Sequence, residues 1–231
     1  MIRALSLDLD DTLWPIAPVI ERAEQALDAW LHAHCPNAAA AWPVDSLREL
    51  RERIWLAHPH LAHDFTELRK LLLRAALGPH GYGEAHVDGA FEVFFAARNR
   101  VDLYADAVPA LQRLAARWPI ASLTNGNADL DRIGIGAHFV ARVCARTSGA
   151  AKPDAAIFAR AAAELGVPAA QIAHVGDDPE LDVRGAQRAG MVGVWLNRDA
   201  APWPHAGEPD IEIASLAELE TALDRFIQRH H

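Results

Sequence analysis

The chain has 231 residues, of which 51% are hydrophobic and 23% charged, a composition typical of a soluble globular protein with one large domain or two small ones. The formal net charge of −9 argues against non-specific binding to nucleic acid, which needs a basic surface. No stretch approaches the roughly 18 apolar residues of a membrane span. The two cysteines provide no disulfide framework. We therefore expect a cytoplasmic protein without nucleic-acid or membrane partners.

The first predicted element is a short apolar run, residues 2–7, which is followed at once by the polar segment DLDDT of residues 8–12. This pattern predicts a buried strand that ends in a polar loop, and ligands of open α/β sheets bind just beyond such strand ends. Asp8 and Asp10 would repel each other there unless a cation or a shared proton compensates their charges. Mg²⁺ prefers oxygen ligands of this kind, although an acidic turn without a ligand is the simpler explanation of the pair taken alone.

Residues 18–101 are almost wholly helical in pattern, with apolar side chains recurring at helical spacing. A second helix of this block is predicted to begin at Ser46, where a glutamate three residues later completes a capping box. A third is predicted to begin at Asp64, again with a glutamate three residues later, and to end at Gly78. A fourth covers about residues 84–100.

From residue 106 onward, helices and strands alternate, which predicts a parallel sheet with right-handed crossovers. The first strand finds no neighbours until after residue 118, so the helical block is predicted to be an insertion. The predicted fold is therefore α/β, a Rossmann-like parallel sheet formed by residues 1–15 and 102–231 with an inserted helical domain of residues 16–101. The later strands are expected at 120–123, 140–145, 172–175, 192–196 and 211–214, and the later helices at 108–117, 155–165, 182–189 and after Ser215.

Three further polar segments lie near the ends of these elements. The strand ending at Leu123 leads into TNGN, a loop whose hydroxyl and backbone N–H groups can face an anion. Lys152 precedes a helix and is a long, flexible point charge suited to a phosphate. The strand ending at Val175 leads into GDDPELD, an all-oxygen acidic set that Mg²⁺ favours. A helix cap, a solvated lysine or an acidic helix start explains each segment alone, but the combination predicts one site.

The four segments DLDDT, SLTNG, Lys152 in AKPD and GDDPELD together resemble the four motifs of the haloacid dehalogenase superfamily. The resemblance spans essentially the whole chain and implies a parallel α/β core with a helical cap inserted after the first strand. The stretches DLDDTLW and HVGDDPELDVRGAQRAGM most resemble the phosphatase branch. Within it they are similar to phosphatases of flavin mononucleotide or of its ribitylaminouracil-phosphate precursor.

This resemblance implies a phosphatase that uses an aspartyl-phosphate intermediate. Asp8 would be the nucleophile, and Asp10 would protonate the leaving oxygen and then activate water. Mg²⁺ would be bound by the Asp8 side chain, the Asp10 backbone carbonyl and Asp177. The substrate phosphate would be bound by Thr124, by the N–H groups of Asn125 and its neighbours, and by Lys152.

The remaining candidate residues concern orientation and substrate choice. Asp182 would orient a metal-bound water or Lys152, and Asp178 would share that role. Trp14 would either stack on a planar leaving group or pack as a hinge residue. His63 or Arg69 would face the active site from the cap.

Other functions of the same sequence stay open at this point. A 2-haloacid dehalogenase needs neither Mg²⁺ nor a second aspartate, and a phosphomutase must exclude water from a bisphosphate. A non-catalytic binding or regulatory module is the alternative of another class, although all the expected catalytic groups are present. The favoured partner is a small phosphorylated metabolite, bound by a monomer or a homodimer.

Overall fold

The computed structural model describes residues 1–230, apart from the side chains of Val44 and Asp45. The chain divides into two compact units. The sheet unit comprises Met1–Pro15, Asp102–Gly126 and the described chain from Ile133 onward, and the helical unit comprises Ile16–Val101 and Asn127–Arg132. The short segment Asn127–Arg132, which the sequence placed with the sheet, therefore groups with the helices. Within residues 1–230, no helix combines the length and apolar character that a membrane crossing needs.

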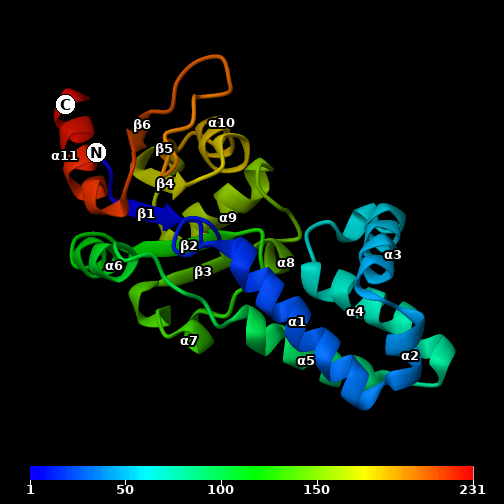
Figure 1. Ribbon diagram of the computed structural model, residues 1–231. Coiled ribbons are helices and arrows are strands. Elements are labelled where there is room, and N and C mark those ends of the chain that lie inside the picture. The colour runs from blue at the N-terminus through cyan, green and yellow to red at the C-terminus, as the bar shows by residue number, and fades with distance from the viewer. Residues whose placement is uncertain (231) are drawn as a thin grey trace. The chain divides into compact units, whose positions relative to one another are not determined.

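The sheet unit is built on six parallel strands in the order β3-β2-β1-β4-β5-β6, with β1 in the interior of the sheet (Figure 1). Leu5 pairs with Ile120 on one side and with Ala173 on the other, so the neighbours of the first strand do follow residue 118. The predicted α/β parallel fold is confirmed. The strands are β1 (Ala4–Leu7), β2 (Ile120–Thr124), β3 (Ala141–Cys144), β4 (Ile172–Gly176), β5 (Val192–Leu196) and β6 (Ile211–Ile213).

Helices link these strands and cover the sheet. Phe158 and Ala186, from two of the linking helices, belong to a buried apolar cluster with Ala4, Leu123 and Ile172 of the strands. The helices of this unit are α6 (Ala107–Ala115), α8 (Ala145–Ser148), α9 (Ala155–Leu165), α10 (Gly185–Arg188) and α11 (Leu219–Arg229), with a π-helix at Pro179–Arg184 and 3-10 turns at Gly136–His138, Ala169–Gln171 and Leu216–Glu218.

In the helical unit, the predicted start at Asp64 is confirmed, because its carboxylate accepts a hydrogen bond from the N–H of Glu67 at 3.0 Å. The predicted start at Ser46 is wrong, because that helix already begins at Val44, directly after Pro43. The helices of this unit are α1 (Ile16–His34), α2 (Pro36–Ala41), α3 (Val44–Ala57), α4 (Phe65–Leu77) and α5 (Glu84–Arg98), with 3-10 turns at Pro59–Leu61 and Gly78–His80 and a short α7 (Leu130–Ile133) at the boundary with the sheet unit.

Asp106 ties three distant segments of the sheet unit together. Its carboxylate accepts hydrogen bonds from both terminal nitrogens of Arg198 at 3.0 and 3.1 Å, from the Ser215 hydroxyl at 2.7 Å and from the N–H of Leu216 at 2.9 Å. Burial alone would raise the pKa of Asp106, but the bonds from Arg198 and Ser215 outweigh it and hold that pKa below its usual value. Charge-assisted bonds of this kind stabilise a fold more than neutral ones do.

We expect Asp106→Asn to lower the free energy of unfolding by about 1–2 kcal/mol at pH 7. Because the folded-state pKa is depressed, the difference from wild type should be present above about pH 4, the usual value, and shrink as the pH falls below it. Urea unfolding at several pH values measures this. The matched control is Asp199→Asn, an exposed aspartate next to Arg198, which should change stability by less than about 0.5 kcal/mol. An equal effect of the two substitutions would contradict the prediction.

Candidate active site

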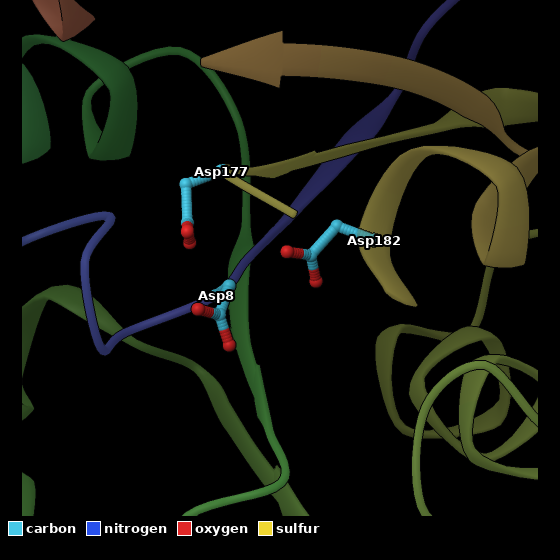
Figure 2. Close-up of side chains that lie close together, drawn as sticks. All are labelled: Asp8, Asp177 and Asp182. Atoms are coloured by element: carbon cyan, nitrogen blue, oxygen red, sulfur yellow. The ribbon is translucent and has the colours of Figure 1, made fainter. Parts of the chain in front are cut away.

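Three carboxylates meet at the carboxyl ends of neighbouring strands. Asp8 directly follows β1, Asp177 directly follows β4, and Asp182 lies in the π-helix that comes next. One oxygen of each lies within 4.8 Å of the others, and Figure 2 shows the three side chains pointing toward a common space. Asp8 is only 6% exposed and Asp182 only 1%. Burial of this much like charge requires compensating positive charge.

Lys152 supplies part of that compensation. Its buried ammonium donates to Asp8 Oδ1 and to Asp182 Oδ1, both at 2.5 Å. The Asn125 side chain fixes the lysine backbone, because its Oδ1 accepts from the Lys152 N–H at 2.7 Å and its Nδ2 donates to the Lys152 carbonyl at 3.0 Å. The loop after β2 therefore positions the lysine that contacts the carboxylates after β1 and β4.

The charges of this cluster are unequally balanced. Burial raises the pKa of Asp8 well above its usual value, and the charges of Asp182 and Asp177 add to this effect while Lys152 opposes it. Burial would also raise the pKa of Asp182, but Lys152 and a hydrogen bond from His174 outweigh it and hold that pKa well below its usual range. The ammonium of Lys152 is thus shared by Asp8 and Asp182, and this one charge does not balance three carboxylates.

Asp177 is held from both its side chain and its backbone. The Thr12 hydroxyl donates to Asp177 Oδ1 at 3.2 Å, and the Trp195 indole N–H donates to the Asp177 carbonyl at 2.9 Å. Burial, followed by the charges of Asp182 and Asp11, raises the pKa of Asp177 to about 7. This carboxylate is therefore fully ionised at neutral pH only with additional positive charge nearby.

Asp10 and Trp14 form a small unit in the loop after β1. Trp14 is fully buried, and its indole N–H donates to Asp10 Oδ1 at 2.9 Å. The Asp10 carboxylate is therefore oriented by a rigid neighbour four residues along the chain. The burial of Trp14 leaves no ring face open for a leaving group, so it supports the packing alternative and not the predicted stacking role.

The loop after β2 begins with a turn closed by the Thr124 side chain. The Thr124 side chain is buried, and its oxygen accepts a hydrogen bond from the Gly126 N–H at 2.9 Å. That bond leaves the hydroxyl hydrogen of Thr124 to donate elsewhere. Asn125 uses its side chain on Lys152, so its contribution to an anion is limited to its backbone N–H.

Asp178 has a structural role in the helix that follows β4. Its Oδ1 accepts from the N–H groups of Glu180 and Leu181, both at 2.8 Å, and so caps the π-helix. This cap starts the helix at Pro179, ahead of the predicted start at residue 182. The backbone N–H of Asp178 donates to Asp182 Oδ2 at 3.1 Å. The backbone of Asp178 thus helps to orient Asp182, and the predicted role of its carboxylate toward a metal-bound water or Lys152 stays a prediction.

Arg69 and His63 belong to the helical unit. Arg69 is buried there, with its guanidinium 2.8 Å from Glu24 Oε1 and 3.9 Å from the centre of the Phe94 ring. It lines a cavity of about 640 Å³ within that unit, whereas His63 is half-buried in the turn before α4. An approach of either side chain to the active site remains a prediction.

Sequence reasoning missed four residues of the site. Thr12 and Trp195 fix Asp177, and Ser6 and His174 form a hydrogen-bonded pair beside Asp182. Ser6 and His174 could have been found from the sequence, because each is a polar residue within an otherwise apolar strand. No local pattern indicates Trp195, because it contacts Asp177 only through the pairing of β4 and β5.

The all-oxygen set suits a hard cation such as Mg²⁺. Both oxygens of Asp182 already accept hydrogen bonds, from Lys152 and His174 at Oδ1 and from Asp178 at Oδ2. Asp8 bonds to Lys152 through Oδ1 and Asp177 to Thr12 through Oδ1. Asp8 and Asp177 are therefore the residues best suited to hold a metal ion.

Comparison with known proteins agrees with this arrangement. Residues 2–190 match a family model described as haloacid dehalogenase-like hydrolase. The chain is 33% identical over 230 residues to 5-amino-6-(5-phospho-D-ribitylamino)uracil phosphatase YigB of Escherichia coli, covering 96% of each protein. It is 34% identical to a phosphoserine phosphatase of Thermus thermophilus, covering 94% of this chain and 98% of that protein. A structure named 2-haloacid dehalogenase, from Pseudomonas syringae, superposes with a TM-score of 0.91 at 38% identity, covering 98% of this chain and 100% of that one.

Proposed function

The chain belongs to the haloacid dehalogenase-like hydrolase family, and from this premise we propose that it is a Mg²⁺-dependent phosphatase acting on a small phosphorylated metabolite. The observation that carries the proposal is the buried cluster of three carboxylates with a single ammonium among them. Such a cluster repels a phosphate unless a cation is added, and its oxygen ligands are those that Mg²⁺ prefers. The 33–34% identity to two phosphatases over nearly the whole chain supports the same conclusion.

In the proposed mechanism, Asp8 is the nucleophile. Its carboxylate forms an O–P bond to the substrate while the bond between phosphorus and the leaving oxygen breaks, and Asp10 donates a proton to that oxygen. Asp10 then takes a proton from a water that attacks the aspartyl-phosphate, which releases phosphate and regenerates Asp8. Mg²⁺ bound by the Asp8 and Asp177 side chains and the Asp10 carbonyl would neutralise charge between nucleophile and substrate.

The phosphate oxygens would be bound by three donors from the loop after β2 and from Lys152. Thr124 donates through its hydroxyl hydrogen, Asn125 through its backbone N–H, and Lys152 through its ammonium. Asp182, whose bonds orient Lys152, acts through that lysine and does not touch the substrate. This division leaves Asp178 outside the chemistry, as a helix cap.

We further propose that the substrate is a flavin-related phosphate, either ribitylaminouracil phosphate or flavin mononucleotide. The 33% identity to the ribitylaminouracil phosphatase, over 96% of both chains, supports this choice. The test is a comparison of kcat/KM across a panel that also contains phosphoserine and glyceraldehyde 3-phosphate, the substrates in the names of two other relatives. A clear preference for either of those two would overturn the flavin assignment and leave the phosphatase intact.

Removal of divalent metal is expected to abolish turnover of a chromogenic aryl phosphate. The cation supplies several kcal/mol of charge stabilisation, so dialysis against EDTA should lower the rate at least about 100-fold, and Mg²⁺ should restore it. Ca²⁺ added at the same concentration is the control for general ionic effects. Full activity in EDTA would contradict the proposed role of Mg²⁺.

The second candidate function is 2-haloacid dehalogenation, which the close likeness to a structure of that name favours. Halide release from 2-chloropropionate in EDTA, without phosphate release from the aryl ester, would establish it in place of the phosphatase. The aspartates at positions 10 and 177 favour the phosphatase, because a dehalogenase needs neither a metal site nor a second aspartate. A cytoplasmic location and a monomeric or homodimeric state stay predictions.

A further inference from the structure

A second polar layer lies directly behind the carboxylates. His174 in β4 and Ser6 in β1 are register partners, and both are fully buried. The Ser6 hydroxyl and His174 Nδ1 are 2.8 Å apart, and His174 Nε2 is 3.1 Å from Asp182 Oδ1. Because side chains alternate along a strand, Ser6 lies on the same face of the sheet as Asp8, two residues on. A continuous chain of contacts therefore runs from Ser6 through His174, Asp182 and Lys152 to Asp8.

The partners of His174 define its tautomer. Asp182 is ionised because of Lys152, so its carboxylate only accepts hydrogen bonds and His174 Nε2 must carry the hydrogen. Burial, together with the charge of Lys152, lowers the pKa of His174 in spite of Asp182. The neutral ring then accepts at Nδ1, and the Ser6 hydroxyl is the donor. Ser6 thus keeps the imidazole hydrogen on the nitrogen that faces Asp182.

Packing around these groups leaves the carboxylate little freedom. The Phe158 ring meets the imidazole edge-on at a centroid distance of 5.2 Å. A Cβ atom at Gly176 would lie 2.2 Å from the Asp182 carboxylate carbon, so only glycine admits the carboxylate at that point. Asp182 Oδ2 is held by the Asp178 N–H, and Oδ1 is held by His174 and Lys152.

We propose that His174 is a positioning residue of this enzyme, which fixes the Asp182 carboxylate by an Nε2–H hydrogen bond and thereby aligns Lys152 on the nucleophile Asp8. This inference deepens the proposed phosphatase function and rests on it for its kinetic consequence. The arrangement itself does not depend on the identity of the substrate. A histidine that only fills the core would leave Lys152 unaffected when replaced.

The test compares three substitutions. His174→Met removes both hydrogen bonds and fills the space with an apolar side chain. It should lower kcat for the aryl phosphate about 10-fold or more with little change in KM. His174→Gln can still donate to Asp182 from its amide and should recover most of that loss. Ser6→Ala removes the donor to Nδ1, and it should lower kcat by a smaller factor. Ser122→Ala is the matched control, because this buried serine pairs with Leu7 and so lies on the other face of the sheet.

The structural readout uses the lysines. The chain has only two, Lys70 and Lys152, so protein labelled with ¹³C at lysine Cε gives one NMR signal from each. We expect the Lys152 signal to move or broaden in His174→Met and Ser6→Ala and to stay near its wild-type position in His174→Gln, while the Lys70 signal stays fixed throughout.

An unchanged Lys152 signal with kcat within twofold of wild type, in folded His174→Met or Ser6→Ala protein, would overturn the proposal. If His174→Met does not fold, Ser6→Ala decides the result. The NMR measurement also separates the two proposals. A displaced Lys152 signal in a protein without phosphatase activity would leave the positioning by His174 standing and refute the proposed function.

Discussion

Replacement of Asp8 by asparagine is expected to lower the rate of phosphate-ester hydrolysis by more than about 10⁴-fold, because it removes the proposed nucleophile. An amide oxygen is a poor nucleophile and carries no charge to hold a metal ion. Single-turnover and steady-state assays with the aryl phosphate measure the loss. Wild-type protein should accumulate an acid-stable phosphorylated residue during turnover, detectable by mass spectrometry at Asp8, and the variant should not.

Stability provides the control for this result. Asp8 is a buried carboxylate beside Asp177 and Asp182, so its replacement relieves repulsion and should leave the metal-free protein at least as stable as wild type. If Asp8→Asn loses activity while its urea unfolding midpoint is not lowered, the loss is one of catalysis and not of folding. Glu164→Gln, a carboxylate-to-amide change at an exposed helix position that pairs with Arg160, should retain activity. Activity of Asp8→Asn within about 10-fold of wild type would contradict the assignment of Asp8 as the nucleophile.

The parallel sheet could be predicted because each strand is a short apolar run with a helical pattern between it and the next. Asp8 and Asp177 directly follow strands and Thr124 is the last residue of β2, and the parallel arrangement brings such ends to one edge of the sheet. The residue types of the motifs thus predicted that the carboxylates of Asp8 and Asp177 lie close together. Lys152 contacts both Asp8 and Asp182 in the structure, whereas its role in binding a phosphate stays a prediction.

The contacts that orient these groups could not be predicted in the same way. The pairing of Ser6 with His174 depends on the register of β1 against β4, which a pattern of period two does not fix across 168 residues of sequence separation. Local capping competes with function at Asp178, whose carboxylate serves the helix start. At Ser46 the capping-box pattern did not mark the helix start, because the helix begins two residues earlier, with Pro43 in the N-cap position.

Lys152→Met is expected to affect both folding and catalysis, because this ammonium is the positive charge between two buried carboxylates. Loss of one partner from a buried ion pair destabilises a protein by about 3–5 kcal/mol. Here the substitution leaves Asp8 and Asp182 facing each other without compensation, so the urea midpoint should fall accordingly in EDTA. Removal of one preorganised charge from the phosphate site should lower kcat by about 10²–10³-fold.

The chain offers a matched control for this substitution. Lys70, the other lysine, bonds to Asp88 at 2.8 Å on the surface of the helical unit, and Lys70→Met should change stability by less than about 1 kcal/mol and leave kcat unchanged. A second variant separates charge from geometry. Asp182→Asn in the Lys152→Met background removes the orphaned carboxylate, and it should recover much of the lost stability without recovering activity, because the ammonium that faces Asp8 is still missing.

Mg²⁺ should act differently on the two defects of Lys152→Met. A cation bound at Asp8 and Asp177 offsets part of the uncompensated charge, so saturating Mg²⁺ should raise the unfolding midpoint of Lys152→Met more than that of wild type. It cannot replace the donor that Lys152 provides to the phosphate, so kcat should stay low at any Mg²⁺ concentration. If Lys152→Met were as stable as wild type in EDTA, the ammonium would not be the counter-charge on which this cluster depends. If Mg²⁺ restored its kcat, Lys152 would not be the proposed donor to the phosphate.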